Sequence, residues 1–559
     1  MALFGVHGAL LLSMERHADR PAQRLPSAPG ERRSRTHGEV RDLVLRLAAG
    51  LRAMGVAPGD RVGLVADLGP WWLPAELAVL AAGGVDVPRG SDTPASELGG
   101  ILAHAGASVC LAVGEEAALR ALAAQPAGGP PRTIVRLDAG PGEAPPGALS
   151  GAEVLERGGG PADPASLPAV RPEDPASLVY TSGTTGRPKG ATLLHRNFLH
   201  QVEVLPAAFD IHDGDVFLAT LPPWHCFERI VEYLAARVGA EVAFSAPRDL
   251  PERLPEAAPT WMASVPRVWE MILATSGHAR LARRDPGRAA EALREALGGR
   301  LRCAVAGGGT VPPEVDDAYN GAGIRFLVGY GLTETAPVLT VRRFESNRTG
   351  TLGRPVEGTE IRIADRDTGA PLPPGRTGVI LARGPQVMRG YWDDPGLTGA
   401  VLSREGWFDT GDLGATTPEG DLVFRGRAKD TIALRGGEKI EPSRLEDRLG
   451  RSPLIEQAVV VGDDRKVLGA LVVPRRKALE GALRGREGEE GAAGRVLREE
   501  CARLLTADAG FAPHERIAVV RVLEEPLTTE NGLLTATLKV RRSAVLERYA
   551  DLVRGMFAP

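Results

Sequence analysis

The chain has 559 residues, of which 43% are hydrophobic and 25% are charged, and its formal net charge is −4. This length exceeds what one hydrophobic core usually supports, so we expect at least two domains, and the composition argues against a disordered or membrane-spanning chain. Charges of both signs are interspersed, so the chain has no basic field of the kind that holds nucleic acid.

The start of the chain and its cysteines bear on compartment. The apolar run from Ala2 to Leu12 has no basic region before it and no clear cleavage site, so we expect a first amphipathic helix there and no signal peptide. No window approaches the roughly 20 apolar residues that span a bilayer, which leaves peripheral contact with the inner membrane face open. The cysteines are scattered, without a CxxC pair or a nearby His cluster, and indicate reduced thiols in a cytoplasmic protein: Cys110, Cys226, Cys303 and Cys501.

Helical patterns alternate with short β-branched runs from about Thr36 to Val113, and again from Ala176 to about Thr340. This alternation predicts a parallel sheet covered by helices on both faces. The stretch between them, from about Gln125 to Asp174, is rich in Pro, Gly, Ala and Asp and predicts a long surface excursion. Short strands between Gly/Pro turns from Gly353 to Phe424 predict a β-rich subdomain.

Beyond Phe424 the pattern changes to short strands and helices, which predicts a separate C-terminal domain. The charged and Gly-rich run from Arg475 to Glu500 predicts an exposed helix–loop insertion. The last helix has an apolar stripe that we expect to pack against this domain: Val545, Leu546, Tyr549, Leu552, Val553 and Met556. The whole pattern predicts an α/β fold, with a large N-terminal domain of layered parallel-type sheets and a small α+β C-terminal domain.

One segment, Leu178 to Ala191, reads Leu-Val-Tyr-Thr-Ser-Gly-Thr-Thr-Gly-Arg-Pro-Lys-Gly-Ala. Glycines permit positive φ and let backbone N–H groups converge on an anion, while hydroxyls and a lysine add donors and charge. The segment is not a Walker A loop, because Pro188 replaces that pattern's second Gly and no Ser or Thr follows Lys189. It predicts a polyphosphate site. The alternative is a surface hairpin turn, for which so many consecutive hydroxyl, turn and lysine positions would be unusual.

This loop resembles the phosphate loop of adenylate-forming enzymes, the family of acyl-CoA synthetases, luciferases and peptide-synthetase adenylation domains. Further motifs of that family follow in its order over nearly the whole chain. The resemblance implies that the phosphates of ATP bind along the loop, at Thr181, Ser182, Gly183, Thr184, Thr185, Gly186 and Lys189.

The segment Gly329-Tyr-Gly-Leu-Thr-Glu-Thr is similar to the family's adenine and magnesium segment. The resemblance implies that Tyr330, followed by Gly331, stacks on adenine and that Thr333 donates to the α-phosphate. It also implies that Glu334 ligates Mg²⁺, a hard cation that prefers oxygen ligands. Taken alone, the segment could equally be a turn at the end of a strand.

Other positions are similar to the family's nucleotide contacts. Gly307 and Gly308 resemble strand-end glycines whose backbone faces adenine, although Gly-rich turns are common in isolation. Asp412 matches the acidic residue that accepts both ribose hydroxyls, the solution that dinucleotide folds also use. Arg427 is similar to an arginine that contacts ribose or phosphate, and Lys429 falls at the hinge position. Basic residues near a domain junction are more often solvated surface.

Near the C-terminus, Lys539 stands where the family keeps its adenylation lysine. Attack of a carboxylate on the α-phosphorus brings two anions together, so a bridging cation lowers the barrier. Thiol attack then needs an open path to the acyl carbonyl. The resemblance therefore implies that residues 428–559 form a mobile cap on an adenylation domain of residues 1–427, hinged at Lys429, with Gly436 facing the pantetheine tunnel.

The identity of the acid is suggested by three segments that resemble long-chain fatty acyl-CoA synthetases: 221–233, 259–270 and the ending Asn-Gly-Leu-Leu-Thr-x-Thr-Leu-Lys. The first of these implies that His225 lies near the acyl carboxylate; a structural histidine is the alternative. Departures from the branch at Trp224, Cys226 and Ala536 leave the chain length of the acid open.

The expected reaction joins a fatty acid to AMP from ATP, with Mg²⁺, and then passes the acyl group to CoA. Residues 86–92 resemble a subgroup that includes fatty acyl–acyl carrier protein synthetases, so acyl carrier protein stays open as the acceptor. A non-catalytic nucleotide- or lipid-binding protein is a remote alternative. A decayed relative would usually have lost at least one of five residues that are all present: Lys189, Glu334, Asp412, Arg427 and Lys539.

Overall fold

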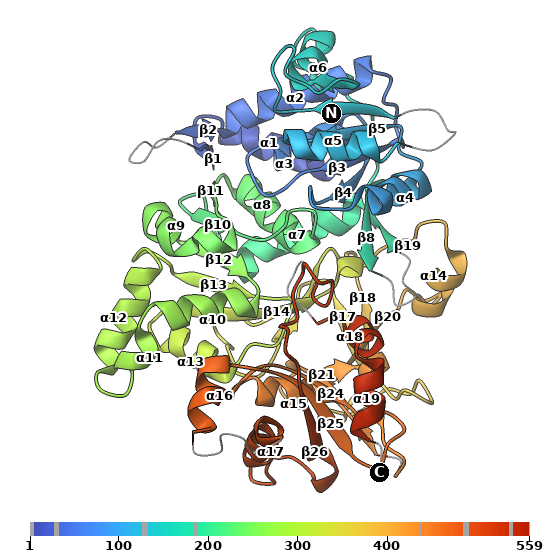
Figure 1. Ribbon diagram of the computed structural model, residues 1–559. Coiled ribbons are helices and arrows are strands. Elements are labelled where there is room, and N and C mark those ends of the chain that lie inside the picture. Colours follow the sequence, from blue (N-terminus) through green and yellow to red (C-terminus); the bar gives the residue numbers. More distant parts are fainter. Residues whose placement is uncertain are drawn as a thin grey trace. The chain divides into compact units, whose positions relative to one another are not determined.

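The computed structural model describes residues 5–26, 33–125, 132–182, 188–436, 438–484, 491–535 and 540–557. The chain folds as two compact units (Figure 1). Unit 1 comprises Met1–Ile361 and Ala382–Phe408, and unit 2 comprises Arg362–Leu381 and Asp409–Pro559. Within the described residues, no helix has both the length and the apolar character needed to cross a bilayer.

The first sheet of unit 1 has a parallel centre formed by β10, β11, β12, β13 and β14. β1 joins it in parallel, while β2, β15 and β16 are antiparallel to their neighbours. Among the described residues it has nine strands, in the order β16 (Arg354–Pro355), β15 (Val338–Val341), β14 (Arg325–Gly331), β13 (Cys303–Ala306), β12 (Trp261–Ser264), β10 (Val216–Ala219), β11 (Glu241–Phe244), β1 (Pro21–Arg24) and β2 (Ser34–Thr36).

The second sheet of unit 1 is parallel from β8 to β7, and β9 and β19 extend it in antiparallel fashion. Its eight strands within the described chain follow the order β19 (Gly390–Tyr391), β9 (Pro188–Leu194), β8 (Pro175–Ser182), β4 (Val85–Arg89), β3 (Arg61–Val65), β5 (Val109–Ala112), β6 (Thr133–Arg136) and β7 (Ala148–Ser150). The predicted helix–strand alternation and its parallel sheets are confirmed.

Helices cover both faces of these sheets, because successive strand residues point to opposite sides. In β13, Cys303 and Val305 face a central core with α1, α3, α7 and α8, whereas Ala304 and Ala306 face a second core with α9, α10, α12 and α13. The helices of unit 1 are α1 (Val6–Arg16), α2 (His37–Ala53), α3 (Trp72–Ala81), α4 (Ala95–Ala105), α5 (Glu115–Ala123), α6 (Gly151–Gly158), α7 (His195–Ala208), α8 (Cys226–Val238), α9 (Leu250–Ala257), α10 (Pro266–Thr275), α11 (His278–Leu281), α12 (Pro286–Ala296), α13 (Pro313–Gly321) and α14 (Pro395–Val401).

The expected surface excursion between Gln125 and Asp174 is wrong in part. β6 and β7 lie in this stretch and extend the second sheet, and α6 follows them. α6 begins with a capping box in which Ser150 and Glu153 exchange hydrogen bonds. Strands of three or four residues are stabilised by the sheet they join and give little periodic signal of their own, which is why the Pro- and Gly-rich composition hid them.

The predicted β-rich block forms a four-stranded sheet, in the order β17 (Glu360–Ala364), β18 (Gly378–Arg383), β20 (Phe408–Thr416) and β21 (Leu422–Arg427). The rest of unit 2 has a strand pair and a three-stranded sheet of β24, β25 and β26. These elements, with the helices that accompany them, are β22 (Ile432–Ala433), β23 (Lys439–Ile440), α15 (Pro442–Leu449), β24 (Ile455–Val461), β25 (Leu468–Pro474), α16 (Arg476–Ala482), α17 (Ala492–Leu504), β26 (Ile517–Val522), α18 (Arg542–Arg548) and α19 (Ala550–Met556).

Two expectations for the C-terminal domain need correction. α17 is not part of an exposed insertion, because it buries Leu497 and Cys501 in the same core as β25 and β26. The expected last helix is two helices, α18 and α19, separated at Tyr549. Val545 and Met556 are buried as predicted, but Leu546, the residue after Val545 on α18, is 37% exposed.

Candidate active site

The carboxyl ends of neighbouring parallel strands in the first sheet line up. Ser264 at the end of β12 pairs with Ala306 of β13, which pairs with Val328 of β14. At the end of β10, the Thr220 hydroxyl lies 3.1 Å from that of Ser264. The loops that follow these strands carry His225, Gly307, Gly308, Thr333 and Glu334, and Tyr330 and Gly331 are the last two residues of β14. Ligands of open α/β sheets bind outside the carboxyl ends of the strands, so the register gathers these residues at such an edge.

Two glycines at this edge are needed for close packing. A Cβ on Gly331 would lie 1.7 Å from the carbonyl oxygen of Pro337, and a Cβ on Gly307 would lie 3.0 Å from the Phe227 ring. A side chain at Gly331 would therefore displace β15 from β14. Phe227 lies two residues beyond His225, so the close approach at Gly307 also brings the start of α8 against the end of β13.

The phosphate-loop candidate joins β8 to β9, which are antiparallel, with Thr181 opposite Lys189. Topologically it is thus a hairpin connection, as the alternative interpretation had it. Its central residues Gly183, Thr184, Thr185 and Gly186 lie outside the described residues, as does the side chain of Ser182. The hydroxyl oxygen of Thr181 is buried and has no hydrogen-bond partner within the described part of the chain. A buried polar atom without a partner is costly, and a bound phosphate would supply one.

Lys189 and Glu334 meet although 145 positions separate them in the sequence. Glu334 lies on the 3₁₀ turn Thr333–Thr335 after β14, and its Oε1 lies 3.4 Å from Lys189 Nζ. The Glu334 residue is 8% exposed. The structure therefore brings the expected phosphate lysine and the expected metal carboxylate together.

Tyr391 of β19 joins this pair, and none of the sequence motifs described above pointed to it. Its hydroxyl donates to Glu334 Oε1 at 2.8 Å and accepts from Lys189, whose Nζ lies 4.2 Å from the centre of the Tyr391 ring. Burial raises the pKa of Tyr391, and the Glu334 carboxylate raises it further. The phenol therefore stays protonated and acts as the hydrogen-bond donor to Glu334.

The site offers few metal ligands of its own. Within the described ranges, no group of three or more His, Cys, Asp or Glu side chains is arranged to hold a metal ion. Glu334 is a single buried carboxylate beside a lysine that suits phosphate. Mg²⁺ is commonly bound by one or two carboxylates together with substrate phosphates, so these residues fit a magnesium ion that arrives with a nucleotide.

His225 precedes α8 and stacks on Trp224, with ring centres 4.6 Å apart. Trp224 in turn lies against Gly90, where a Cβ would come within 2.6 Å of the indole nitrogen. Behind it, the buried Glu228 accepts hydrogen bonds from the N–H groups of Thr220 and Leu221. Burial raises the pKa of Glu228 to about 8, although these two N–H groups act to lower it. Glu228 thus fixes the turn from which the His225 segment leaves β10.

The next residue of the 221–233 segment, Arg229, is fully buried. Its guanidinium contacts Glu76 at 3.1 Å and Asp86 at 3.0 Å, and donates to the Ser177 hydroxyl at 2.8 Å. Burial alone would lower the pKa of Arg229, but the two carboxylates raise it. Asp86, from the segment that resembles carrier-protein synthetases, is therefore a partner of Arg229 inside unit 1 and does not reach the surface.

Unit 2 holds the remaining candidates. Asp412 and Arg427 are cross-strand neighbours in β20 and β21, and Arg427 Nε lies 3.3 Å from Asp412 Oδ1. Asp412 is 3% exposed, whereas the Arg427 side chain is 43% exposed. Lys429 lies on the 3₁₀ turn Ala428–Asp430, and Gly436 lies in the turn between β22 and β23. Lys539 lies outside the described residues.

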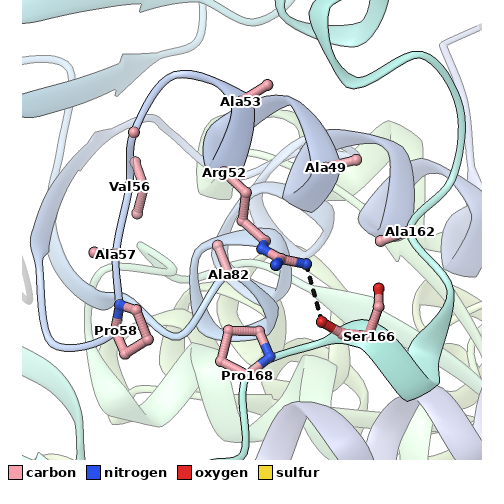
Figure 2. Close-up of a pocket in the computed structure, with 11 residues that line it drawn as sticks. Ala49, Arg52, Ala53, Val56, Ala57, Pro58, Ala82, Ala162, Ser166 and Pro168 are labelled. Carbon is pink, nitrogen blue, oxygen red and sulfur yellow. Dashed lines mark hydrogen bonds between the residues drawn. The ribbon is translucent and has the colours of Figure 1, made fainter.

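One surface cavity, of about 680 Å³, lies elsewhere in unit 1 (Figure 2). It is bounded by the end of α2 and by loops that precede β3 and β4, so it lies toward the amino ends of the parallel strands. The Arg52 guanidinium donates to the Ser166 carbonyl oxygen at 3.0 Å across it. None of the expected site residues lines this cavity: its walls are Ala49, Arg52, Ala53, Gly55, Val56, Ala57, Pro58, Ala82, Ala162, Ser166 and Pro168.

Comparison with known families accounts for this arrangement. Residues 12–392 match the AMP-binding enzyme family, and residues 429–559 match the AMP-binding enzyme C-terminal domain. The chain belongs to the AMP-binding enzyme family. The predicted membership of the adenylate-forming superfamily is thereby confirmed.

This AMP-binding enzyme has relatives of similar length. It is 33% identical to the long-chain-fatty-acid–CoA ligase FadD15 of Mycobacterium tuberculosis, over 93% of this chain and 92% of the relative. It is 31% identical to the chloroplastic long-chain-fatty-acid–[acyl-carrier-protein] ligase AEE15 of Arabidopsis thaliana, over 94% of this chain and 82% of that one. The adenylation domain of a Mycobacterium chelonae carboxylate reductase shares the fold, with a TM-score of 0.79, 24% identity and coverage of 100% and 94% of the two chains.

Proposed function

We propose that the protein is an ATP-dependent fatty acid ligase. It forms a fatty acyl-AMP and pyrophosphate from ATP, and then transfers the acyl group to the thiol of CoA with release of AMP. The observation that carries the proposal is the meeting of Lys189 and Glu334 at the carboxyl ends of the strands, next to the Thr181 hydroxyl, which has no hydrogen-bond partner among the residues that the structure describes. Two relatives that match nearly the whole chain are named long-chain-fatty-acid ligases, which supports a fatty acid as the substrate.

The roles of the residues follow from their chemistry. Lys189, with the β8–β9 loop, binds the β- and γ-phosphates, and Thr333 donates to the α-phosphate. Glu334 holds the Mg²⁺ that ATP carries, which neutralises phosphate charge as pyrophosphate leaves. The adenine lies against Tyr330, Gly331, Gly307 and Gly308, the ribose hydroxyls bond to Asp412 and Arg427, and His225 lies beside the acyl carboxylate.

In this proposal the first step depends on Lys539. Its ammonium bridges the acyl carboxylate and the α-phosphate, which lowers the repulsion between two approaching anions. The thiol then needs access to the acyl carbonyl, so residues 428–559 reorient about Lys429 between the steps, and Gly436 borders the path of the pantetheine. The working location that we expect, the cytoplasm, stays a prediction.

The first step is tested by pyrophosphate release from MgATP with a panel of fatty acids. We expect release that depends on the acid, and an approximately 10²- to 10³-fold lower rate for Lys539→Ala, the usual effect of removing one charge-stabilising donor. Lys477→Ala, at an exposed position on α16, is the matched control and should release pyrophosphate at the wild-type rate. Full-speed release by Lys539→Ala would overturn the proposed first step.

A second candidate function differs only in the thiol that accepts the acyl group, because one relative is named for CoA and another for acyl carrier protein. Both acceptors present the same phosphopantetheine thiol. Preformed acyl-adenylate on the enzyme should be discharged by CoA; discharge by acyl carrier protein alone would replace CoA with the protein acceptor. Binding of ATP and fatty acid without pyrophosphate release would favour the non-catalytic alternative.

A further inference from the structure

The segment around Tyr391 connects the two halves of the candidate phosphate and metal site. Trp392 N–H donates to the Gly190 carbonyl oxygen at 2.7 Å, which ties the segment to β9 beside Lys189. Met388 N–H donates to the Glu334 carbonyl oxygen at 2.9 Å, which ties it to the turn after β14. The backbone of residues 388–392 thus spans from the lysine to the glutamate, and the Tyr391 side chain lies between them.

The side chains repeat this connection with different chemistry. Tyr391 is 6% exposed, and Lys189 Nζ lies 4.2 Å from the centre of its ring and donates a hydrogen bond to its hydroxyl oxygen. The phenol O–H in turn donates to Glu334 Oε1 at 2.8 Å. Lys189 also contacts the same carboxylate oxygen, at 3.4 Å. One carboxylate oxygen therefore receives both a cation and a neutral donor.

These two contacts differ in what happens to them when a nucleotide binds. If Lys189 turns to phosphate, Glu334 loses its neighbouring cation, but the phenol needs no charge to stay hydrogen-bonded to the carboxylate. A hydrogen bond to a charged group that is buried is among the stronger ones, and it fixes the direction of the second carboxylate oxygen. The ring face likewise lets Lys189 move along a cation–π surface without leaving the site.

We propose that Tyr391 is a positioning residue that docks Lys189 on its ring and orients the Glu334 carboxylate with its hydroxyl, so that the two groups separate onto phosphate and magnesium in a fixed geometry. This inference rests on the proposed function, since it takes Glu334 as the magnesium ligand and Lys189 as the phosphate ligand. Tyr391 itself need not touch the reacting atoms.

The test uses the full-length Tyr391→Phe variant, which keeps the ring and removes only the hydroxyl. Calorimetric titration with ATP, in chelator and in excess Mg²⁺, gives the factor by which magnesium increases ATP affinity. We expect this factor to fall about tenfold in Tyr391→Phe, the effect of losing one hydrogen bond to a charged group, while the affinity in chelator changes less than about twofold. In pyrophosphate release, KM for MgATP should rise more than kcat falls.

A matched control separates positioning from structure. Tyr319 on α13 is also buried, and its hydroxyl donates to the Trp269 carbonyl oxygen at 3.0 Å. Tyr319→Phe should alter thermal unfolding without altering the magnesium factor. In the Glu334→Gln background, Tyr391→Phe should cause no further loss of the factor, because the hydroxyl acts through the carboxylate.

An unchanged magnesium factor in a folded Tyr391→Phe protein would overturn the proposal, as would equal losses in the Tyr319→Phe control. An additional loss in the Glu334→Gln background would overturn it too, since the hydroxyl would then act elsewhere. If Tyr391→Phe unfolds, Tyr391→Trp keeps a ring face and lacks the phenol, and the same fall in the factor is expected. Failure of the wild-type protein to release pyrophosphate with any acid would instead refute the proposed function, because the ATP titration does not depend on turnover.

Discussion

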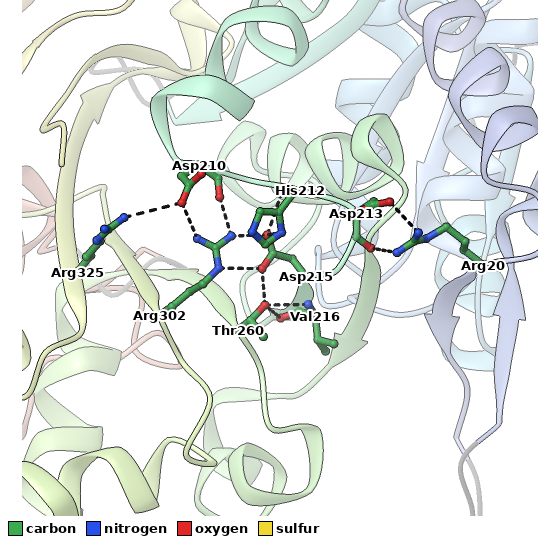
Figure 3. A network of polar contacts seen from close by, with 9 residues as sticks. All are labelled: Arg20, Asp210, His212, Asp213, Asp215, Val216, Thr260, Arg302 and Arg325. Carbon is green, nitrogen blue, oxygen red and sulfur yellow. Dashed lines mark hydrogen bonds and ion pairs between the residues drawn. The ribbon is translucent and has the colours of Figure 1, made fainter.

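The nine-stranded sheet of unit 1 ends in polar residues at both edges, but the two edges differ in how those residues are bonded. At the amino edge, Asp215 precedes β10, Thr260 precedes β12 and Arg302 precedes β13 (Figure 3). Arg302 donates to both oxygens of Asp215, at 3.1 and 2.6 Å, and the Thr260 hydroxyl donates to the same carboxylate at 2.6 Å. Asp215 is 2% exposed, and its neighbours use its hydrogen-bonding capacity.

At the carboxyl edge the polar groups keep capacity for a further partner. Here Glu334, which follows β14 of this sheet, forms a loose pair at 3.4 Å with Lys189 of β9 in the second sheet. The buried hydroxyl oxygen of Thr181, on the neighbouring β8, has no partner among the described residues. Glycines replace side chains where the backbone is approached closely, as at Gly331. The comparison indicates that the amino edge serves stability, whereas the carboxyl edge is arranged for a ligand.

The largest expected effect is a loss of activity from a substitution at the carboxyl edge that leaves the protein folded. Glu334→Gln keeps an oxygen that can accept from Tyr391 but removes the charge that a magnesium ion needs. We expect acid-dependent pyrophosphate release to fall about a hundredfold or more, and the free energy of unfolding to change by less than about 1 kcal/mol because the Lys189 side chain is partly exposed. Rate assays with urea unfolding measure both quantities. Loss of stability in proportion to activity would mean that this edge is structural as well.

At the amino edge we expect the reverse, a loss of stability without a loss of activity. Asp215→Ala leaves the buried Thr260 hydroxyl and the partly exposed Arg302 guanidinium without this acceptor and should cost about 2 kcal/mol of unfolding free energy, while kcat per folded molecule stays at the wild-type value. Burial alone would raise the pKa of Asp215, but its hydrogen bonds from Arg302 and Thr260 lower it overall. The stability it contributes is thus present above its ordinary pKa and lost as pH falls through the folded value.

A control for that prediction lies in the same network. Arg325 lies 3.8 Å from Asp210, and both side chains are 56% exposed. Exposed pairs contribute little, and the contact of Arg325 with the Phe344 ring adds a small amount, so Arg325→Ala should cost less than about 1 kcal/mol. A loss as large as that of Asp215→Ala would show that burial does not distinguish the two pairs.

Some elements of the fold and of the site could be predicted from the sequence, and others could not. The helix–strand alternation could be predicted because β3, β5 and β13 are short apolar runs between helices. The residues of the site in unit 1 could be predicted because their motifs follow strands directly. β6, β7 and the burial of α17 could not, because their stability comes from the strands and the core that they pack against and not from their own short or charged sequences.

The least predictable feature was contact between distant polar residues. Tyr391 belongs to a two-residue edge strand, and nothing in its local sequence indicates that its hydroxyl reaches Glu334. Arg229 lies in the 221–233 segment that resembles long-chain fatty acyl-CoA synthetases, but its enclosure by Glu76 and Asp86 depends on how β4, α3 and α8 pack together. Spacing along the chain identifies residue types that suit a reaction, whereas pairing requires the three-dimensional arrangement.

The last expected effect is a pH dependence, and it concerns a buried acid on α8. Glu232 on α8 is 1% exposed, and neither carboxylate oxygen has a hydrogen-bond partner in the described part of the chain. Burial raises the pKa of Glu232 well above its ordinary value near 4.5, and Glu228 and Glu76 raise it further. The folded state therefore keeps a proton that the unfolded chain releases above about pH 4.5, so stability falls as pH rises from that value toward the folded pKa.

Glu232→Gln removes this titration and keeps the shape of the side chain. Relative to the wild type, the variant should gain up to about 1.4 kcal/mol of unfolding free energy for each pH unit above pH 4.5, until the folded pKa is reached. Urea unfolding of both proteins between pH 5 and pH 8, about the range where an unshifted carboxyl is already ionised, measures the difference. A constant difference across that range would mean that Glu232 titrates normally, and that the interior around α8 solvates charge as well as Arg302 solvates Asp215 at the amino edge.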